Sequence, residues 1–214
     1  MIRIIFEDEH LLVLNKPPGI LSVPGKTEPD CLQARAMIYN PNCRAIHRLD
    51  MATSGLLIFA KNHAALRAMS TAFETRKVSK TYHTIVQGLP AQDQGLIDQP
   101  LRCDWPNRPK QMICYEHGRT SQTRYSVITR HHAKAAALMY LYPITGRSHQ
   151  LRVHCEHLGH PILGDQLYGN EASRAAAPRL LLHAAELSFE HPVSQKTMAL
   201  SCPSGFENFA EEAT

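Results

Sequence analysis

The most constraining feature of the chain is the run His47-Arg48-Leu49-Asp50-Met51-Ala52-Thr53-Ser54-Gly55, which leads directly into the apolar residues 56–60. The apolar residues have the length and composition of a buried strand. Aspartate is almost never buried without a partner, so a carboxylate beside such a strand needs a reason. Asp50 is therefore either an acceptor in a turn with Thr53 and Ser54 or a group kept ionised for chemistry.

Charge is unevenly distributed along the chain. The 214 residues have a formal net charge of only +4, but residues 31–152 hold 17 of the 23 Lys and Arg residues and 6 of the 19 acidic residues. A basic segment of this kind suits binding to a polyphosphate such as a nucleic acid. A solvated surface without a partner has the same composition, so charge alone leaves both interpretations open.

Composition is that of an ordinary globular protein. Hydrophobic residues make up 43% and charged residues 20%, and no apolar run reaches the length of about 18 residues that a membrane helix needs. The N-terminus turns acidic after a few apolar residues, unlike a secretory signal. The six cysteines form no CxxC pair, which argues against a zinc ribbon or a disulfide framework. We therefore expect reduced thiols and a cytoplasmic location.

Sequence patterns predict more strands than helices. Short connections outnumber the long crossovers that parallel strands need, so we expect an α+β fold with a mixed, largely antiparallel sheet and flanking helices. The segment after Pro17-Pro18-Gly19 reads as a long loop, and the acidic tail 206–214 is expected to fray. The predicted strands are 2–6, 10–15, an alternating strand through Tyr82, Thr84 and Val86 that ends at Gly88, the two strands 123–129 and 137–143 as a hairpin, 179–190 and 196–202. The predicted helices are 148–158 and 63–77; the latter is capped by Asn62, and its apolar residues Leu66, Met69 and Phe73 recur at spacings of three and four.

Two motifs point to other chemistry. Residues 19–27 approach a phosphate-binding loop, but five residues separate the glycines where that loop has four, and Pro24 removes an amide donor. A cluster of histidines, His149, His154, His157 and His160, could hold a metal ion in a hydrolase. The cluster lacks an HExxH pattern and a suitably spaced carboxylate, and packing or phosphate contacts account for it equally well.

The run at residues 47–55 resembles the HRLDxxTSG signature of the RluA family of pseudouridine synthases at every fixed position. Further matches occur in the family's order and spacing, and the resemblance extends from about residue 10 to about residue 203. They are Asn15-Lys16-Pro17-Pro18-Gly19, Lys80-Thr81-Tyr82, Thr145-Gly146-Arg147-Ser148-His149-Gln150-Leu151-Arg152, the block at 158–169, and Leu180-Leu181-Leu182-His183-Ala184. The resemblance implies the catalytic fold of this family in a single domain, 1–214, with no room before residue 10 for the S4-like RNA-binding domain that some members carry.

The family resemblance also implies an activity and its catalytic residues. Pseudouridine synthases break the bond between ribose C1′ and uracil N1, turn the base over and rejoin it through C5, which requires no cofactor and no metal. Asp50 takes the role of nucleophile or stabiliser, and Arg147 holds it charged and oriented. Tyr82 packs on the uracil and takes the C5 proton. The alternatives are a phosphate contact for Arg147 and a core position for Tyr82.

Substrate expectations follow from the same comparison. Residues 103–111 resemble the branch of the family that acts on both large-subunit ribosomal RNA (23S rRNA) and the tRNA anticodon stem-loop. Arg48 corresponds to the arginine that enters the RNA helix as the target base leaves it; a surface salt bridge is its alternative. We expect a monomer, with RNA contacts by His47, Arg48, Arg108, Lys110 and Arg152. A synthase specific for one RNA class and a non-catalytic RNA-binding protein are the alternatives.

Overall fold

The structure is a computed structural model that describes residues 2–209. These residues divide into two compact units, each of which is considered by itself. Unit 1 is formed by the chain up to Lys80 together with residues 183–203, and unit 2 by residues 81–182 with the segment from Ser204 onward. The single domain expected from the sequence stays a prediction.

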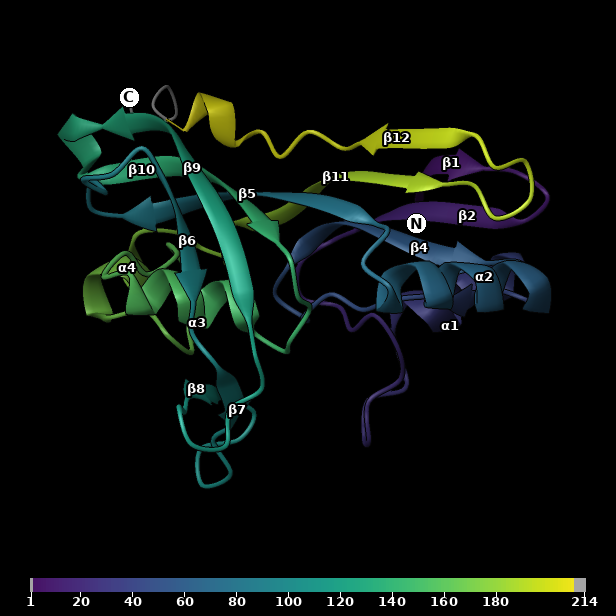
Figure 1. The fold of residues 1–214 in the computed structure, drawn as a ribbon, viewed down its shortest axis with the longest axis horizontal. Helices are drawn as coiled ribbons and strands as arrows, with labels where there is room; N and C mark the ends of the chain where they lie inside the picture. Colours follow the sequence, from purple (N-terminus) through teal and green to yellow (C-terminus); the bar gives the residue numbers. More distant parts are fainter. Residues whose placement is uncertain (1, 210–214) are drawn as a thin grey trace. The chain divides into compact units, whose positions relative to one another are not determined.

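Unit 1 is built on a mixed sheet (Figure 1). β4 and β11 are parallel to each other, whereas the remaining pairs in this unit are antiparallel. This arrangement agrees with the predicted sheet, and the first two predicted strands are confirmed to within two residues. The strands are β1 (Arg3–Glu7), β2 (Leu11–Lys16), β4 (Ser54–Ala60) and β11 (Leu182–Glu190) in spatial order, with β12 (Thr197–Ser201) beside β11 and β3 (Arg44–Ala45) beside β4.

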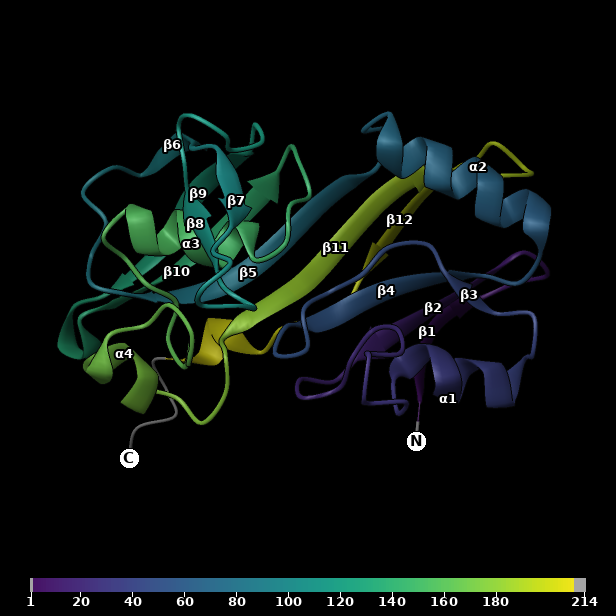
Figure 2. The same cartoon turned by 90° about the horizontal axis from the view of Figure 1, so that it is seen from below.

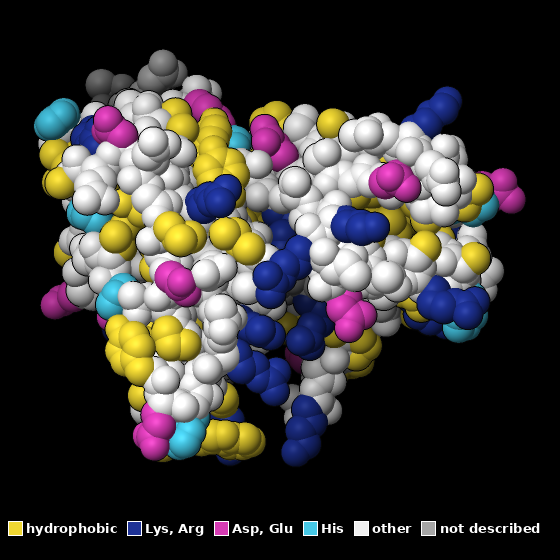
Figure 3. Space-filling view, in the orientation of Figure 1, with side chains coloured by type: hydrophobic (Ala, Val, Ile, Leu, Met, Phe, Trp, Pro, Cys, Tyr) yellow, Lys and Arg dark blue, Asp and Glu magenta, His cyan; other side chains and the backbone are white. Residues whose placement is uncertain are grey.

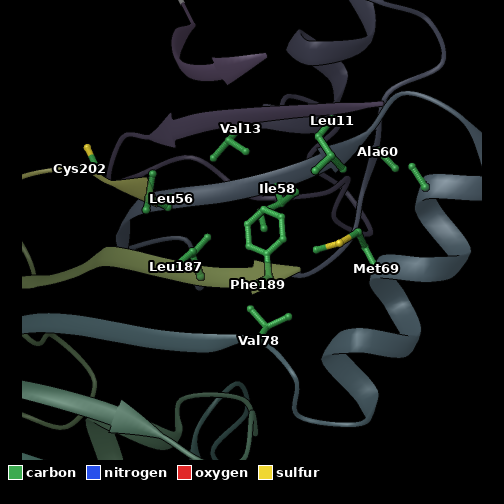
Figure 4. Close-up of a cluster of buried hydrophobic side chains, with 11 residues drawn as sticks. Leu11, Val13, Leu56, Ile58, Ala60, Met69, Val78, Leu187, Phe189 and Cys202 are labelled. Carbon is green, nitrogen blue, oxygen red and sulfur yellow. The ribbon is translucent and has the colours of Figure 1, made fainter. Parts of the chain in front are cut away.

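Two helices lie on one face of this sheet, as the two ribbon views show (Figures 1 and 2). α2 (His63–Glu74) begins at the predicted cap, where Asn62 Oδ1 accepts a hydrogen bond from the Ala65 N–H at 2.9 Å. α1 (Leu32–Tyr39) lies in the segment that was predicted to be a long loop, so that prediction was wrong. Side chains from β2, β4, β11 and α2 form the apolar core of the unit (Figure 4).

Unit 2 has an antiparallel sheet and a separate two-stranded hairpin. β9 and β10 form the predicted hairpin. The predicted alternation in β5 was wrong, because residues 83–86 are all buried, as in a strand covered on both faces. The strands are β5 (Ser79–Gln87), β10 (Ala136–Pro143), β9 (Gln122–His131) and β6 (Gln94–Asp98) in spatial order, and β7 (Leu101–Cys103) with β8 (Gln111–Ile113) in the hairpin.

The helices of unit 2 are short. The predicted helix 148–158 is confirmed as α3 (Gln150–His157), and α4 (Glu171–Ala175) follows it. Phe206, in the short 3-10 helix η2 (Phe206–Asn208), packs into a core with Ile85 and Leu138, so this part of the tail is held in place; residues 210–214 of the predicted fraying tail lie outside the described residues. Throughout residues 2–209, no helix is long and apolar enough to cross a membrane.

Candidate active site

Asp50 lies in the loop of unit 1 that enters β4, and main-chain hydrogen bonds hold this loop. The Thr53 N–H donates to the Asp50 carbonyl at 3.1 Å, and the Gly19 N–H donates to the Met51 carbonyl at 2.9 Å. Asp50 is half-buried, whereas Thr53 is only 2% exposed. The turn that the sequence suggested at Asp50 is thus present in the main chain.

Lys16 holds the same loop through side-chain hydrogen bonds. Its side chain is completely buried, and Nζ donates to the carbonyls of Pro17 (3.0 Å), Ile20 (2.7 Å) and Met51 (2.9 Å). Burial lowers the pKa of Lys16 to about 8, and the negative charge of Asp50 opposes that lowering. At neutral pH the ammonium is therefore mostly charged, and it adds positive charge near the carboxylate while joining two loops. Lys16 is part of a matched motif, but its role in holding this loop was not predicted from the sequence.

Two more buried polar residues, Ser22 and His183, hold the loop by hydrogen bonds on either side of Asp50. Neither role was predicted from the sequence. Ser22 Oγ donates to the Leu49 carbonyl at 2.6 Å and accepts from the Leu49 N–H at 2.9 Å. His183 lies with Nδ1 2.8 Å from Ser54 Oγ and Nε2 3.0 Å from the Cys202 carbonyl. Because a carbonyl can only accept, Nε2 carries the proton and Nδ1 accepts from Ser54. These contacts fix the loop at Leu49, before Asp50, and at Ser54, after it.

Gly55 ends the signature run because no side chain fits there. Its φ is +114°, and a Cβ at this position would lie 2.3 Å from the carbonyl oxygen of Ala184, its partner in β11. We expect Gly55→Ala to lower the free energy of unfolding by more than about 2 kcal/mol, as measured by urea denaturation. Gly146→Ala is the control, since a Cβ at Gly146 meets nothing within 4 Å. Equal stability of the two variants would contradict this account of Gly55.

His47 holds the loop in place through a ring contact and a hydrogen bond of its Nε2 nitrogen. The ring stacks on Phe73 of α2, with centroids 4.6 Å apart, and Nε2 accepts from the Ile58 N–H at 3.2 Å. Burial and the charge of Lys80 lower the pKa of His47 to about 3, so the ring is neutral at physiological pH. His47 therefore cannot supply a positive charge to a phosphate. The neighbouring Arg48 is exposed.

Tyr82 lies on β5 of unit 2, opposite Leu141 of β10. Its side chain is half-buried, whereas the next residue, His83, is 6% exposed and stacks on Tyr140 with ring centroids 3.9 Å apart. Tyr82 is thus not a fully buried core aromatic. Partial exposure on a strand with buried neighbours suits a ring that packs against a ligand.

Arg147 lies just before α3 in unit 2, in a segment organised by Gln150. Gln150 Oε1 accepts from the Arg147 N–H at 3.0 Å and from Thr145 Oγ1 at 2.7 Å. The Arg147 side chain is exposed, and its Nε donates to the Thr120 carbonyl at 3.2 Å. The backbone and one side-chain nitrogen are therefore fixed, which orients the guanidinium.

Arg152 has a structural role, and the RNA contact predicted for it stays a prediction. It is 4% exposed and forms a bidentate ion pair with Asp165, Nε to Oδ2 at 2.8 Å and Nη2 to Oδ1 at 2.6 Å. Burial alone would raise the pKa of Asp165, but the hydrogen bonds and charge of Arg152 lower it overall. The guanidinium also lies 5.0 Å from the ring of Tyr168, whose hydroxyl is 2.7 Å from His149 Nδ1. This network reaches the start of α3 through His149, the residue that precedes the helix.

Arg108 and Lys110 lie in the turn between β7 and β8. The Arg108 guanidinium covers the ring of Trp105, 4.4 Å from its centroid, and Trp105 is 62% exposed. The Gln111 N–H donates to the Tyr168 hydroxyl at 2.8 Å, which ties the base of this hairpin to the network described above. Arg108 is exposed and Lys110 half-buried. RNA contacts by these two residues stay a prediction.

Three of the four clustered histidines, His149, His154 and His160, lie within hydrogen-bond distance of protein groups, whereas His157 is exposed. His154 has Nδ1 2.9 Å from Thr123 Oγ1 and Nε2 3.2 Å from the Gln99 carbonyl, and His160 Nδ1 is 2.8 Å from the Gln87 carbonyl. Among the described residues, no three His, Cys, Asp or Glu side chains gather as they would around a metal ion. These contacts assign His154 and His160 to packing and hydrogen bonding.

Comparison with known proteins identifies the family. A family model described as RNA pseudouridylate synthase matches residues 10–157. The chain belongs to this family. It is 50% identical over 215 residues to the dual-specificity RNA pseudouridine synthase RluA of Vibrio vulnificus (strain CMCP6), a match that covers 98% of this chain and 86% of the relative. It is 48% identical to the RluA of Escherichia coli (strain K12), with 95% and 93% covered.

A solved structure agrees with the family assignment. The structure of human RNA Pseudouridylate Synthase Domain Containing 1 matches with a TM-score of 0.82 at 30% identity, covering 98% of this chain and 86% of that one. The predicted family and the α+β fold class are therefore confirmed. The predicted enzyme class is confirmed as well: the protein is an isomerase that forms pseudouridine in RNA.

Proposed function

We propose that this pseudouridine synthase modifies loop uridines in two RNA classes, large-subunit ribosomal RNA and the tRNA anticodon stem-loop. The observation that carries the proposal is the identity of 48–50% to relatives named dual-specificity enzymes, which extends over 95–98% of this chain. The same matches cover 86–93% of the relatives' own length. Specificity for one RNA class is the alternative.

In the proposed mechanism, Asp50, Tyr82 and Arg147 act on the same uridine. Asp50 is the nucleophile or stabiliser when the glycosidic bond breaks, and the positive charge of Lys16 lies near it. Tyr82 packs on the detached uracil and removes the C5 proton. Arg147 orients the carboxylate through two parallel donors. The target base leaves the helix to reach these groups, and Arg48 takes its place.

The proposed RNA partner agrees with the exposed basic side chains. Figure 3 shows many Lys and Arg side chains on the face that it presents, and Arg48, Arg108 and Arg147 are all exposed. Such cations bind RNA phosphates and make binding depend on salt. We further propose that the protein acts as a monomer in the cytoplasm.

Arg147→Lys is expected to reduce the rate of pseudouridine formation by about 10- to 100-fold although the charge is kept. An ammonium cannot supply the two parallel donors of a guanidinium. Single-turnover rates on a saturating stem-loop measure the effect, with Arg174→Lys, exposed on α4, as the control. If the Arg147 variant differs from wild type only in RNA affinity, Arg147 is a phosphate contact.

Isolated stem-loops test the proposed specificity. Bases in loops can be splayed out and read, so a short stem-loop of each RNA class should be a sufficient substrate. We expect pseudouridine in a ribosomal stem-loop and in an anticodon stem-loop, each at one uridine. Modification of only one class would reject dual specificity. Modification of intact ribosomal RNA but of neither stem-loop would reject recognition of a local loop.

A further inference from the structure

Three positively charged residues follow one another closely in the sequence of unit 1, between the end of α2 and the start of β5. Arg76 and Lys77 are exposed, and Lys80 is half-buried. In the part of the chain that the structure describes, none of the three forms a side-chain hydrogen bond or an ion pair. By contrast, the buried Lys16 donates to three carbonyls, and Lys61 pairs with Glu7 at 2.9 Å.

Lys80 is in an unfavourable position for a cation. Burial lowers its pKa, and the positive charge of Arg76 lowers it further. Within residues 2–209, no carboxylate offsets these two effects. A partly desolvated charge beside a like charge destabilises the fold unless an opposite charge arrives from outside. The arrangement therefore indicates a site for an anion.

The backbone holds Arg76 in a strained conformation. Its φ is +60°, in the left-handed region where glycine is usual after a helix, and an arginine there costs about 1 kcal/mol. The Lys77 N–H still closes the helix by donating to the Ala72 carbonyl at 2.8 Å, and Val78, 5% exposed, anchors the segment in the core. Strain of this kind, held by the surrounding fold, is typical of binding sites.

The end of α2 also contacts the loop of Asp50. His47 of that loop stacks on Phe73, three residues before Arg76, and the charge of Lys80 acts on the His47 ring. We propose that Arg76 and Lys80 bind one backbone phosphate of the RNA substrate, beside the nucleotide on which Asp50 acts. The proposal rests on the proposed function and adds a site that positions the strand.

RNA affinity tests the site. Lys80→Gln and Arg76→Gln are each expected to weaken binding of a substrate stem-loop about tenfold, since each removes a charged contact to the phosphate. The slope of log affinity against log salt should also fall by about 0.7–0.9 for the lost phosphate. Lys196→Gln, which removes an exposed charge in the turn between β11 and β12, is the control. Variants that bind with the affinity and slope of the control would overturn the site.

A second pair of measurements distinguishes a binding role from a structural one. Lys80→Met is expected to raise the melting temperature of the free protein because it removes an unpaired, half-buried charge. A lower melting temperature would make Lys80 a structural residue. Single phosphate linkages of the RNA can be replaced, one at a time, with neutral methylphosphonates. We expect replacement at one linkage to weaken binding to the wild-type protein. The same replacement should not weaken binding to the Lys80→Gln variant any further. An effect of equal size on both proteins would mean that Lys80 does not contact that phosphate.

Failure of this site can be told apart from failure of the proposed function. If wild-type protein forms pseudouridine in the stem-loops while both Gln variants bind RNA normally, only the phosphate site is wrong. If wild-type protein forms no pseudouridine in either stem-loop, the substrate assignment is wrong, and so is the role proposed for the phosphate site.

Discussion

Asp50→Asn is expected to lower the rate of pseudouridine formation by at least about a thousandfold and to leave RNA affinity within about threefold of wild type. Asparagine keeps the size and much of the hydrogen bonding of aspartate but lacks the negative charge that the chemistry requires. The loop should persist, because its main-chain turn and the contacts of Lys16 and Ser22 do not involve the carboxylate. Single-turnover rates and binding by fluorescence anisotropy separate the two effects.

Asp30→Asn is a matched control for this change. Asp30 is an exposed carboxylate in the same unit, where it pairs with Arg35 at 2.6 Å. Its loss should leave the rate unchanged, since exposed ion pairs contribute little. An Asp50 variant that keeps near wild-type turnover would remove Asp50 from the mechanism.

Tyr82→Phe is expected to lower the rate of product formation by about a hundredfold or more, which is the usual contribution of a positioned general base. The phenyl ring still packs on uracil, so cleavage of the glycosidic bond should survive better than the final loss of the C5 proton. Quenched reactions analysed for both bond cleavage and pseudouridine would show this difference. Tyr115→Phe, which changes an exposed phenol of the same unit, should have no effect. An undiminished rate of pseudouridine formation would show that Tyr82 is not the base.

Strong local signals made most of the fold predictable from the sequence. The Asn62 cap, the spacing of apolar residues in α2 and the β9–β10 hairpin are examples, since each depends on neighbours in the chain. α1 was missed because its cap is Cys31, whose sulfur accepts from the Ala34 N–H at 3.3 Å, an unusual capping residue. β5 was misread because burial on both faces is a property of the tertiary structure.

The sequence gives candidate residues for the site but not their contacts. The signature run identified Asp50, yet nothing local shows that Lys16 donates to a carbonyl 35 residues away. The sequence motif around Arg152 predicts an RNA contact, but it does not show that Arg152 forms a buried ion pair with Asp165. His47 suggested the same, but its environment keeps it neutral. Partners distant in sequence decide the role of a charged group, and they emerge only with the fold.

Pseudouridine mapping of total RNA tests the central claim most directly. It compares a strain lacking this gene with the same strain carrying either the wild-type gene or the Asp50→Asn variant. We predict that the deletion removes one pseudouridine from large-subunit ribosomal RNA and one from a tRNA anticodon arm, and that only the wild-type gene restores both. A map that the deletion leaves unchanged, or that the Asp50→Asn variant restores in full, would contradict the account.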